Sequence, residues 1–183
     1  LYDEVPEYGY DALSSWVRAA KRIIKVLHLR KTLPDRNKLN FLDAGCGDGM
    51  LGVLAESFGF TAFLVDKKDW RDPRAKHLPF SAQQVEDLSN IKSDQIDVVC
   101  SFNSFEHFQN PKTAFTELIR VTKPGGCIFL EFGPLYHGPW GLHAYRSLRM
   151  PYPQFLFSKD FIQQKLLDLG IYDLGGKQSN LQY

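Results

Sequence analysis

The chain has 183 residues, of which 44% are hydrophobic and 23% charged, and its formal net charge is +1. This length suffices for one domain with its own hydrophobic core, and we expect residues 1–183 to form a single domain. A nearly neutral charge does not favour nucleic acid as a partner, and no apolar run approaches the roughly 20 residues that cross a bilayer, so membrane insertion is not expected.

The N-terminal part of the chain predicts a helix. From Asp11 to Leu27, apolar side chains recur every three or four residues, and a polar connection over residues 32–38 follows. The basic residues opposite the apolar stripe are Arg18, Lys21, Arg22 and Lys25. Because the chain begins at Leu1 rather than at Met, it could be a fragment, and the lack of a leader says little about targeting.

The next part has the order strand, turn, helix, strand. Residues 39–44 form an apolar run, residues 45–49 a glycine-rich turn, and residues 50–58 a helical stretch. A second apolar run, residues 61–65, ends at Asp66. Such a unit requires a right-handed crossover and a parallel pair of strands.

The alternation continues along the chain. Residues 96–101 predict a strand, and Asn110 is a good N-cap for a helix over residues 111–122. The turn predicted at residues 123–126 ends this helix, and residues 127–132 form another strand. We therefore predict an α/β fold with a doubly wound, mostly parallel sheet.

The C-terminal part is less regular. Residues 133–157 are rich in glycine, proline, histidine and aromatic residues, and we expect a substrate loop there. Ser158 is predicted to cap a last helix over residues 159–169. Residues 171–174 could begin a further strand, but no partner for a closing hairpin is visible, so the sheet is expected to lack its closing C-terminal strands.

The strongest functional signal runs from Asp43 to Gly49. Glycines at positions 45, 47 and 49 allow a sharp turn and a close ligand approach, and the following helix offers N–H groups to an anion. Asp66 lies 17 residues after Gly49, where a carboxylate can accept from ribose hydroxyls. The spacing is G-x-G-x-G rather than the G-x-G-x-x-G of dinucleotide folds, and Asp43 suits an ammonium or sulfonium group. An amino-acid nucleoside is therefore favoured over NAD.

Several motifs occur together between residues 39 and 132. They are Asp43-Ala44-Gly45-Cys46-Gly47-Asp48-Gly49, Asp66, Val85-Glu86-Asp87-Leu88, Ile96-Asp97-Val98-Val99-Cys100-Ser101, and Asn110-Pro111 through Arg120-Val121-Thr122-Lys123-Pro124-Gly125-Gly126. In this order they resemble the class I S-adenosylmethionine-dependent methyltransferases, and the small-molecule branch above all. Two departures are Gln84, where many relatives have Asp, and the short, charged segment after Asp66.

The resemblance implies a Rossmann-like methyltransferase fold, S-adenosylmethionine as cofactor, and methyl transfer to a small-molecule acceptor. The implied residues are Asp43, Gly45, Gly47 and Gly49 at the methionine end, Asp66 at the ribose, Gln84, Val85 and Glu86 around the adenine, and Ser101 and Phe102 beside the sulfur. Cys46 and Lys67 complete the expected cofactor-binding set.

Methyl transfer needs in-line alignment, exclusion of water and sometimes a base. His107 and His143 are the main candidates, with His137 beside His143 in the aromatic loop, and a structural role is the alternative for His107. In some branches of the family an acid helps to bind a divalent metal where this chain has Asn103, so no metal is expected.

Two other functions stay open: a methyltransferase-like module that binds cofactor weakly or scaffolds partners without activity, and an NAD-dependent oxidoreductase. The three cysteines, Cys46, Cys100 and Cys127, match neither a disulfide framework nor a zinc site. We expect them to be packed thiols in a reducing, cytoplasmic compartment. The sequence indicates neither the acceptor's identity nor the oligomeric state.

Overall fold

A computed structural model describes residues 12–33, 38–142 and 148–171. The described residues divide into two compact units, which span residues 12–132 and 133–171. The larger unit holds the β-sheet with helices α1, α2 and α3, and the smaller unit holds helices α4 and α5.

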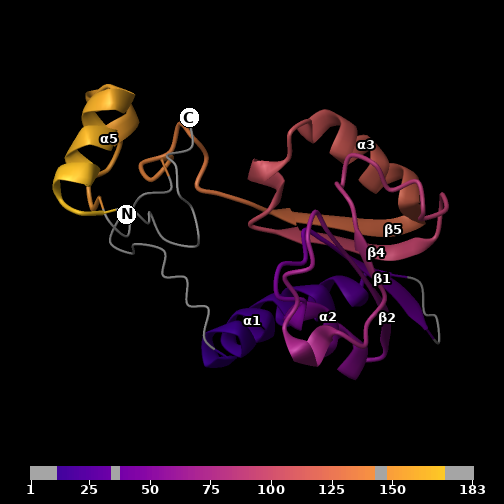
Figure 1. Ribbon diagram of the computed structural model, residues 1–183. Helices are drawn as coiled ribbons and strands as arrows, with labels where there is room; N and C mark the ends of the chain where they lie inside the picture. The colour runs from indigo at the N-terminus through magenta and orange to yellow at the C-terminus, as the bar shows by residue number, and fades with distance from the viewer. Residues whose placement is uncertain (1–11, 34–37, 143–147, 172–183) are drawn as a thin grey trace. The chain divides into compact units, whose positions relative to one another are not determined.

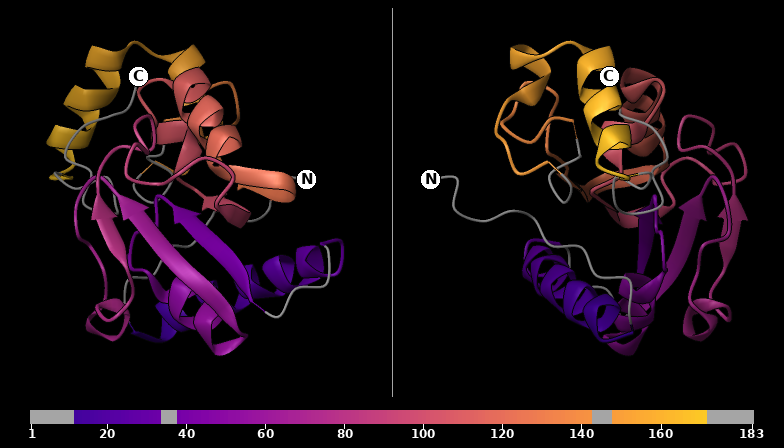
Figure 2. Two further views of the ribbon diagram at one scale, coloured as in Figure 1. Left: turned by 90° about the vertical axis from the view of Figure 1, so that its right-hand side faces the viewer. Right: turned by 60° about the vertical axis from the view of Figure 1, so that its left-hand side comes forward.

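The larger unit is built on a sheet of five strands in the order β3-β2-β1-β4-β5. The strands are β1 (Leu39–Ala44), β2 (Phe60–Asp66), β3 (Phe80–Ala82), β4 (Ile96–Phe102) and β5 (Thr122–Glu131). All neighbours pair in parallel, and the arrows of β1, β2 and β3 point the same way in the left view of Figure 2. The order reverses between β1 and β4, so the end of β1 lies at the switch point where open α/β sheets bind ligands.

Helices cover both faces of this sheet. Helices α1 (Ala12–Arg30) and α2 (Met50–Ser57) lie on one face, and α3 (Pro111–Val121) lies on the other (Figure 1). Because successive side chains of a strand point to opposite faces, Phe41 joins the core under α1 and α2 while Leu42 joins the core under α3. The predicted doubly wound α/β fold is confirmed.

Two predicted helix caps are present. The Asn110 side chain accepts a hydrogen bond from the backbone N–H of Thr113 at 3.1 Å, at the start of α3. The Ser158 hydroxyl accepts one from the N–H of Phe161 at 3.3 Å, at the start of α5 (Lys159–Asp168). Each cap satisfies an N–H group that the helix itself leaves without a partner.

The strand after α3 begins earlier than predicted, at Thr122 rather than at Cys127, and residues 123–126 form an irregularity within it. Thr122 already pairs with Ile96, and the ladder between β4 and β5 resumes after a bulge. The Lys123 ammonium group donates to the Asp97 carboxylate at 2.7 Å, and Asp97 is buried. A buried carboxylate requires such partners, so this ion pair ties the bulge between Thr122 and Cys127 to β4.

Strand β3 was not predicted. Its three residues, Phe80–Ala82, pair in parallel with residues 64–66 of β2. Three residues are too few to show a period-two pattern. This strand therefore depends on the edge that β2 offers rather than on a local signal.

The smaller unit has its own apolar cluster, formed by Leu142, Ile162 and Leu166. One helical turn, α4 (Pro153–Leu156), lies within the segment predicted to be irregular. The strand predicted at residues 171–174 falls outside the described residues except for Ile171, which belongs to no helix or strand.

The three cysteines are free thiols, and Cys46 and Cys100 are buried while Cys127 is half-buried. Their predicted role as packed thiols is confirmed for the two buried ones. Among the described residues, no helix combines the length and the apolar character that crossing a membrane requires.

Candidate functional site

The glycine-rich turn after β1 is joined to the end of β2. The N–H groups of Gly45 and Cys46 both donate to the carbonyl oxygen of Val65, at 2.8 and 3.0 Å. The N–H of Gly47 donates to Oδ2 of Asp66 at 2.9 Å. The structure thus brings the turn and the downstream acid together, as the spacing of the two motifs predicts.

Two glycines of the turn are required for different reasons. Gly45 has a φ of +80°, and a Cβ there would lie 2.5 Å from Cβ of Ser104, whose hydroxyl donates to the Gly45 carbonyl at 2.9 Å. Gly47 has a φ of +53°, and its missing side chain would point into open space. The first glycine allows close packing within the protein, and the second leaves the outer side of the turn clear for a ligand.

Asp43 is a buried acid at the end of β1. Its side chain is 2% exposed, and its Oδ2 has no hydrogen-bond partner among the described residues. Burial raises the pKa of Asp43 to about 7; the charge of Arg22 opposes this rise, whereas Asp48 and Asp66 add to it. A buried polar atom without a partner is costly, so a cation or donor that reached Asp43 would be strongly favoured.

A second buried polar atom lies on the neighbouring strand. The hydroxyl oxygen of Ser101 is fully buried and has no partner within the described part of the chain. Asp43 pairs with Cys100 in the β1–β4 register, so Ser101 is one residue beyond the position opposite Asp43. Because successive side chains of a strand point to opposite faces, Ser101 lies on the α3 face of the sheet and Asp43 on the face of α1 and α2, so each is a buried polar group near the carboxyl end of its own strand.

Helix α1 brings basic side chains to the same turn. Arg18 forms an ion pair with Asp48 at 2.7 Å, and the Arg22 guanidinium lies 5.1 Å from the centre of the Phe102 ring. The sequence did not identify these arginines as site residues, because helical spacing places them only on the polar face of α1. The fold turns part of that face toward the end of the sheet.

The predicted adenine-binding residues differ in their surroundings. Val85 is buried in the core under α3, whereas Gln84 is exposed. Glu86 accepts a hydrogen bond from the backbone N–H of Asn110 at 3.1 Å, so its carboxylate is engaged at the start of α3. The N–H of Gln83 donates to the Asp66 carbonyl at 3.0 Å, which connects this segment to the end of β2.

The other predicted residues are dispersed. Phe102 is buried, with its ring centre 5.4 Å from that of Phe129, and Lys67 is exposed just after β2. His107 is exposed in the short helix η2 (Phe105–His107) beyond β4. His143 lies outside the described residues. The roles of both histidines therefore stay predictions.

The known proteins that this chain resembles in sequence are methyltransferases. A family model described as a methyltransferase domain matches residues 16–170. A ubiquinone biosynthesis O-methyltransferase of Dictyostelium discoideum is 31% identical over 111 residues, which covers 51% of this chain and 35% of that protein. The chain therefore spans well under half the length of this curated relative.

Two solved structures share the fold. One, from an antibiotic biosynthesis pathway of Anabaena variabilis and assigned as a methyltransferase, has a TM-score of 0.53 and 20% identity over 82% of this chain and 61% of its own. The other, from Methanococcus maripaludis and assigned as S-adenosyl-L-methionine-dependent, has a TM-score of 0.52 and 16% identity over 91% and 75%. By the family match and the parallel five-stranded sheet, the chain belongs to the methyltransferase domain family and has the fold of class I S-adenosylmethionine-dependent methyltransferases.

Proposed function

We propose that the chain binds S-adenosylmethionine at the carboxyl ends of β1, β2 and β4 and transfers its methyl group to a small-molecule acceptor. The observation that carries this proposal is the buried Asp43 carboxyl, whose Oδ2 has no hydrogen-bond partner in the described part of the chain, beside a turn held by Asp66. The family match supports the same conclusion.

The residues present fit the methionine end of this cofactor. A ligand ammonium group would donate to Oδ2 of Asp43, which no donor of the described residues reaches, and would favour the ionised carboxylate. Arg18 and Arg22, from α1, place positive charge near Asp48 and Asp43 and suit a ligand carboxylate. The open side of Gly47 leaves room for the chain between these groups.

The nucleoside end falls to Asp66 and the segment after β3. The hydrogen bond from Gly47 orients the Asp66 carboxylate, which we assign to the ribose hydroxyls. Gln84 is exposed and can accept from the adenine amino group, with Val85 as the buried support of the same segment. Cys46, Glu86 and Lys67 stay within the proposed cofactor surroundings.

When bound, S-adenosylmethionine supplies an activated methyl group on a positively charged sulfur. The protein then has to align the acceptor with that methyl group, exclude water and, for some acceptors, remove a proton. We assign the border of the sulfur to Ser101 and Phe102, and proton removal to His107 or His143.

We further propose that residues 133–157 bind the acceptor within one working domain. Tyr136, His137 and Phe155 form an aromatic group there, with ring centres 5.4 to 5.8 Å apart. Hydroxyl-bearing acceptors are the first class to test, because the Dictyostelium relative is named as an O-methyltransferase.

Titration calorimetry with S-adenosylhomocysteine tests the proposal. We expect the wild-type chain to bind it and not to bind NADH. Heat on adding NADH alone would favour an oxidoreductase, and binding without methyl transfer to any hydroxyl acceptor would leave a cofactor-binding module. Absence of binding to S-adenosylhomocysteine would overturn the proposal.

A further inference from the structure

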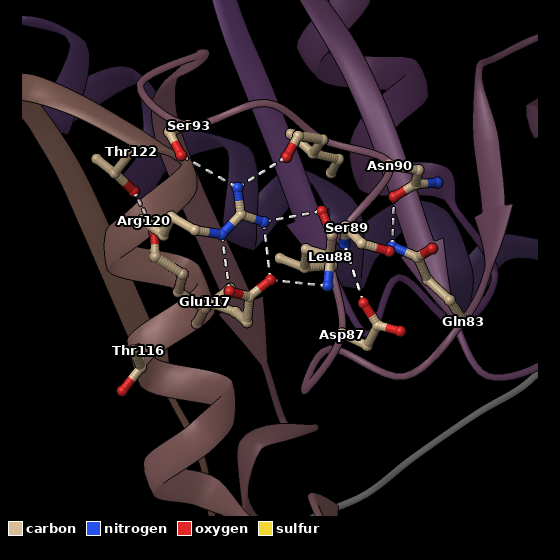
Figure 3. Close-up of polar contacts among 12 residues, drawn as sticks. Gln83, Asp87, Leu88, Ser89, Asn90, Ser93, Thr116, Glu117, Arg120 and Thr122 are labelled. Carbon is tan, nitrogen blue, oxygen red and sulfur yellow. Dashed lines mark hydrogen bonds and ion pairs between the residues drawn. The ribbon is translucent and has the colours of Figure 1, made fainter.

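Two residues of α3 hold the segment that follows β3. Glu117 Oε2 accepts a hydrogen bond from the N–H of Leu88 at 2.9 Å, and Arg120 donates to the carbonyl oxygens of Leu88 and Ile91, both at 2.9 Å (Figure 3). The turn from Leu88 to Ile91 is closed by its own hydrogen bond of 2.8 Å. One arginine and one glutamate therefore fix both ends of a turn that follows directly on the proposed adenine-binding residues.

The pair is also fixed within itself. Arg120 donates from Nε to one oxygen of Glu117 at 2.7 Å and from a terminal nitrogen to the other at 2.8 Å. The hydrogen bonds lower the pKa of Glu117 and raise that of Arg120, so both stay charged. Only a planar guanidinium can make this fork and still reach two carbonyl oxygens, so lysine is not an equivalent replacement.

A separate set of contacts holds the other end of the segment. The Gln83 side chain donates to Oδ1 of Asn90 at 2.7 Å (Figure 3). Asn90 in turn donates to the Ser81 hydroxyl at 2.6 Å. The backbone of Gln83 is bonded to Asp66 at 3.0 Å. Residues 84–87 thus lie between one anchor at the ends of β2 and β3 and another on α3.

Apolar packing and hydrogen bonds contribute differently to this segment: the first favours its folding, and the second fixes its position. The side chains of Val85, Leu88 and Ile91 are buried in the core under α3, so apolar packing also holds the segment to the sheet. Apolar attraction is non-directional, whereas hydrogen bonds to two carbonyls and one N–H depend on distance and angle. The Arg120–Glu117 pair therefore determines where residues 84–87 lie more than whether they fold.

We propose that Arg120, acting through Glu117 and the backbone of Leu88 and Ile91, is a positioning residue that sets the protein's selectivity for the adenine base. The inference rests on the proposed binding of S-adenosylmethionine. Recognition of an amino group at a base edge requires an acceptor such as Gln84 at hydrogen-bond distance, so a shift of about 1 Å in residues 84–87 weakens it. Contacts to the ribose and the methionine end come from other elements and are unaffected.

The test compares two ligands on matched variants by calorimetry. The ligands are S-adenosylhomocysteine and its inosine analogue, in which a carbonyl replaces the adenine amino group. Arg120→Lys removes the fork while keeping the charge. Arg74→Lys is the control, because Arg74 forms a similar fork with Asp72, at 2.8 and 2.9 Å, away from residues 84–87. Glu117→Gln supplies a second variant if Arg120→Lys does not fold.

We expect wild type and Arg74→Lys to prefer the adenosyl ligand equally. In Arg120→Lys the preference should fall about fivefold to tenfold, the value of one hydrogen bond, with little change for the inosine analogue. Equal weakening of both ligands would reveal a purely structural role and overturn the inference, as would an unchanged preference or a wild type without preference. Failure of the wild type to bind either ligand would overturn the proposed function and this inference with it.

Discussion

The carboxylate of Asp66 accepts a hydrogen bond from the backbone N–H of Gly47 at 2.9 Å. Asp66 ends β2 and Gly47 lies in the turn just after β1, and the parallel β1–β2 register, in which Ala44 pairs with Val65, brings them side by side. The bond joins the turn directly to the acid. A ligand that contacts Asp66 therefore also meets the open side of Gly47.

Asp66→Asn should weaken cofactor binding without disturbing the turn. The amide oxygen of asparagine can still accept from Gly47, but the negative charge toward the ribose hydroxyls is lost. Loss of charge-assisted hydrogen bonds worth about 1.5–3 kcal/mol corresponds to a 10- to 100-fold rise in the Kd for S-adenosylhomocysteine. Calorimetry measures the Kd, and Asp160→Asn on the exposed start of α5 is the control. An unchanged Kd in Asp66→Asn would remove Asp66 from the site.

Cofactor affinity should rise with pH up to about 7 and then level off. Asp43 has a pKa raised to about 7 by burial, so below that pH a cationic ligand group must displace its proton. We expect binding about tenfold tighter at pH 8 than at pH 6. Asp43→Asn should bind more weakly at pH 8 and lose this dependence. If Asp43→Asn kept the full pH dependence of cofactor affinity, the titrating group would be another residue.

The same group predicts how stability without ligand depends on pH. Asp43 has a higher pKa in the folded chain than its ordinary 3.8, so the folded state holds a proton that the unfolded state releases between these values. Its contribution to stability is complete below about pH 4 and is lost as the pH rises through about 7. Urea unfolding at several pH values should show this decline in wild type and a smaller one in Asp43→Asn. Equal declines would contradict the assignment.

Gly45→Ala should be more destabilising than Gly59→Ala. Both glycines have a positive φ, of +80° and +83°, which costs another residue about 1 kcal/mol. A Cβ at Gly59 meets nothing within 4 Å, whereas one at Gly45 would lie 2.5 Å from Cβ of Ser104. Overpacking adds roughly 1–3 kcal/mol. Urea unfolding measures both variants, and equal losses would show that Ser104 moves away freely.

Asn110→Ala should lower the free energy of unfolding by about 1 kcal/mol, because the Thr113 N–H loses its acceptor at the start of α3. Asn110→Asp keeps a side-chain acceptor and should stay near the wild-type value. Chemical unfolding compares the two variants. A loss of similar size in both would mean that the amide, rather than the cap, carries the effect.

Much of the larger unit could be predicted from local patterns. The bounds of β1, Leu39–Ala44, agree with the predicted strand, and the cap at Asn110 is present. Both signals are local: an apolar run that ends at a glycine, and a capping residue followed by proline, can be recognised from residues adjacent in the sequence. The joining of Asp66 to the turn could be predicted as well, because parallel strands end at the same edge.

The tertiary structure decided what depends on residues far apart in the chain. Strand β3 forms on the edge of β2, and β5 begins at Thr122, beside a bulge where Lys123 donates to Asp97. No local sequence pattern indicates that Arg22 lies near Asp43. None indicates that Arg120 donates to the carbonyl oxygen of Leu88. A sequence pattern records which side of an element is buried, but a charged side chain finds its partner only when separate elements have packed. The sequence alone therefore determined the fold class and the turn with its acid, and the packing of α1 and α3 decided what surrounds them.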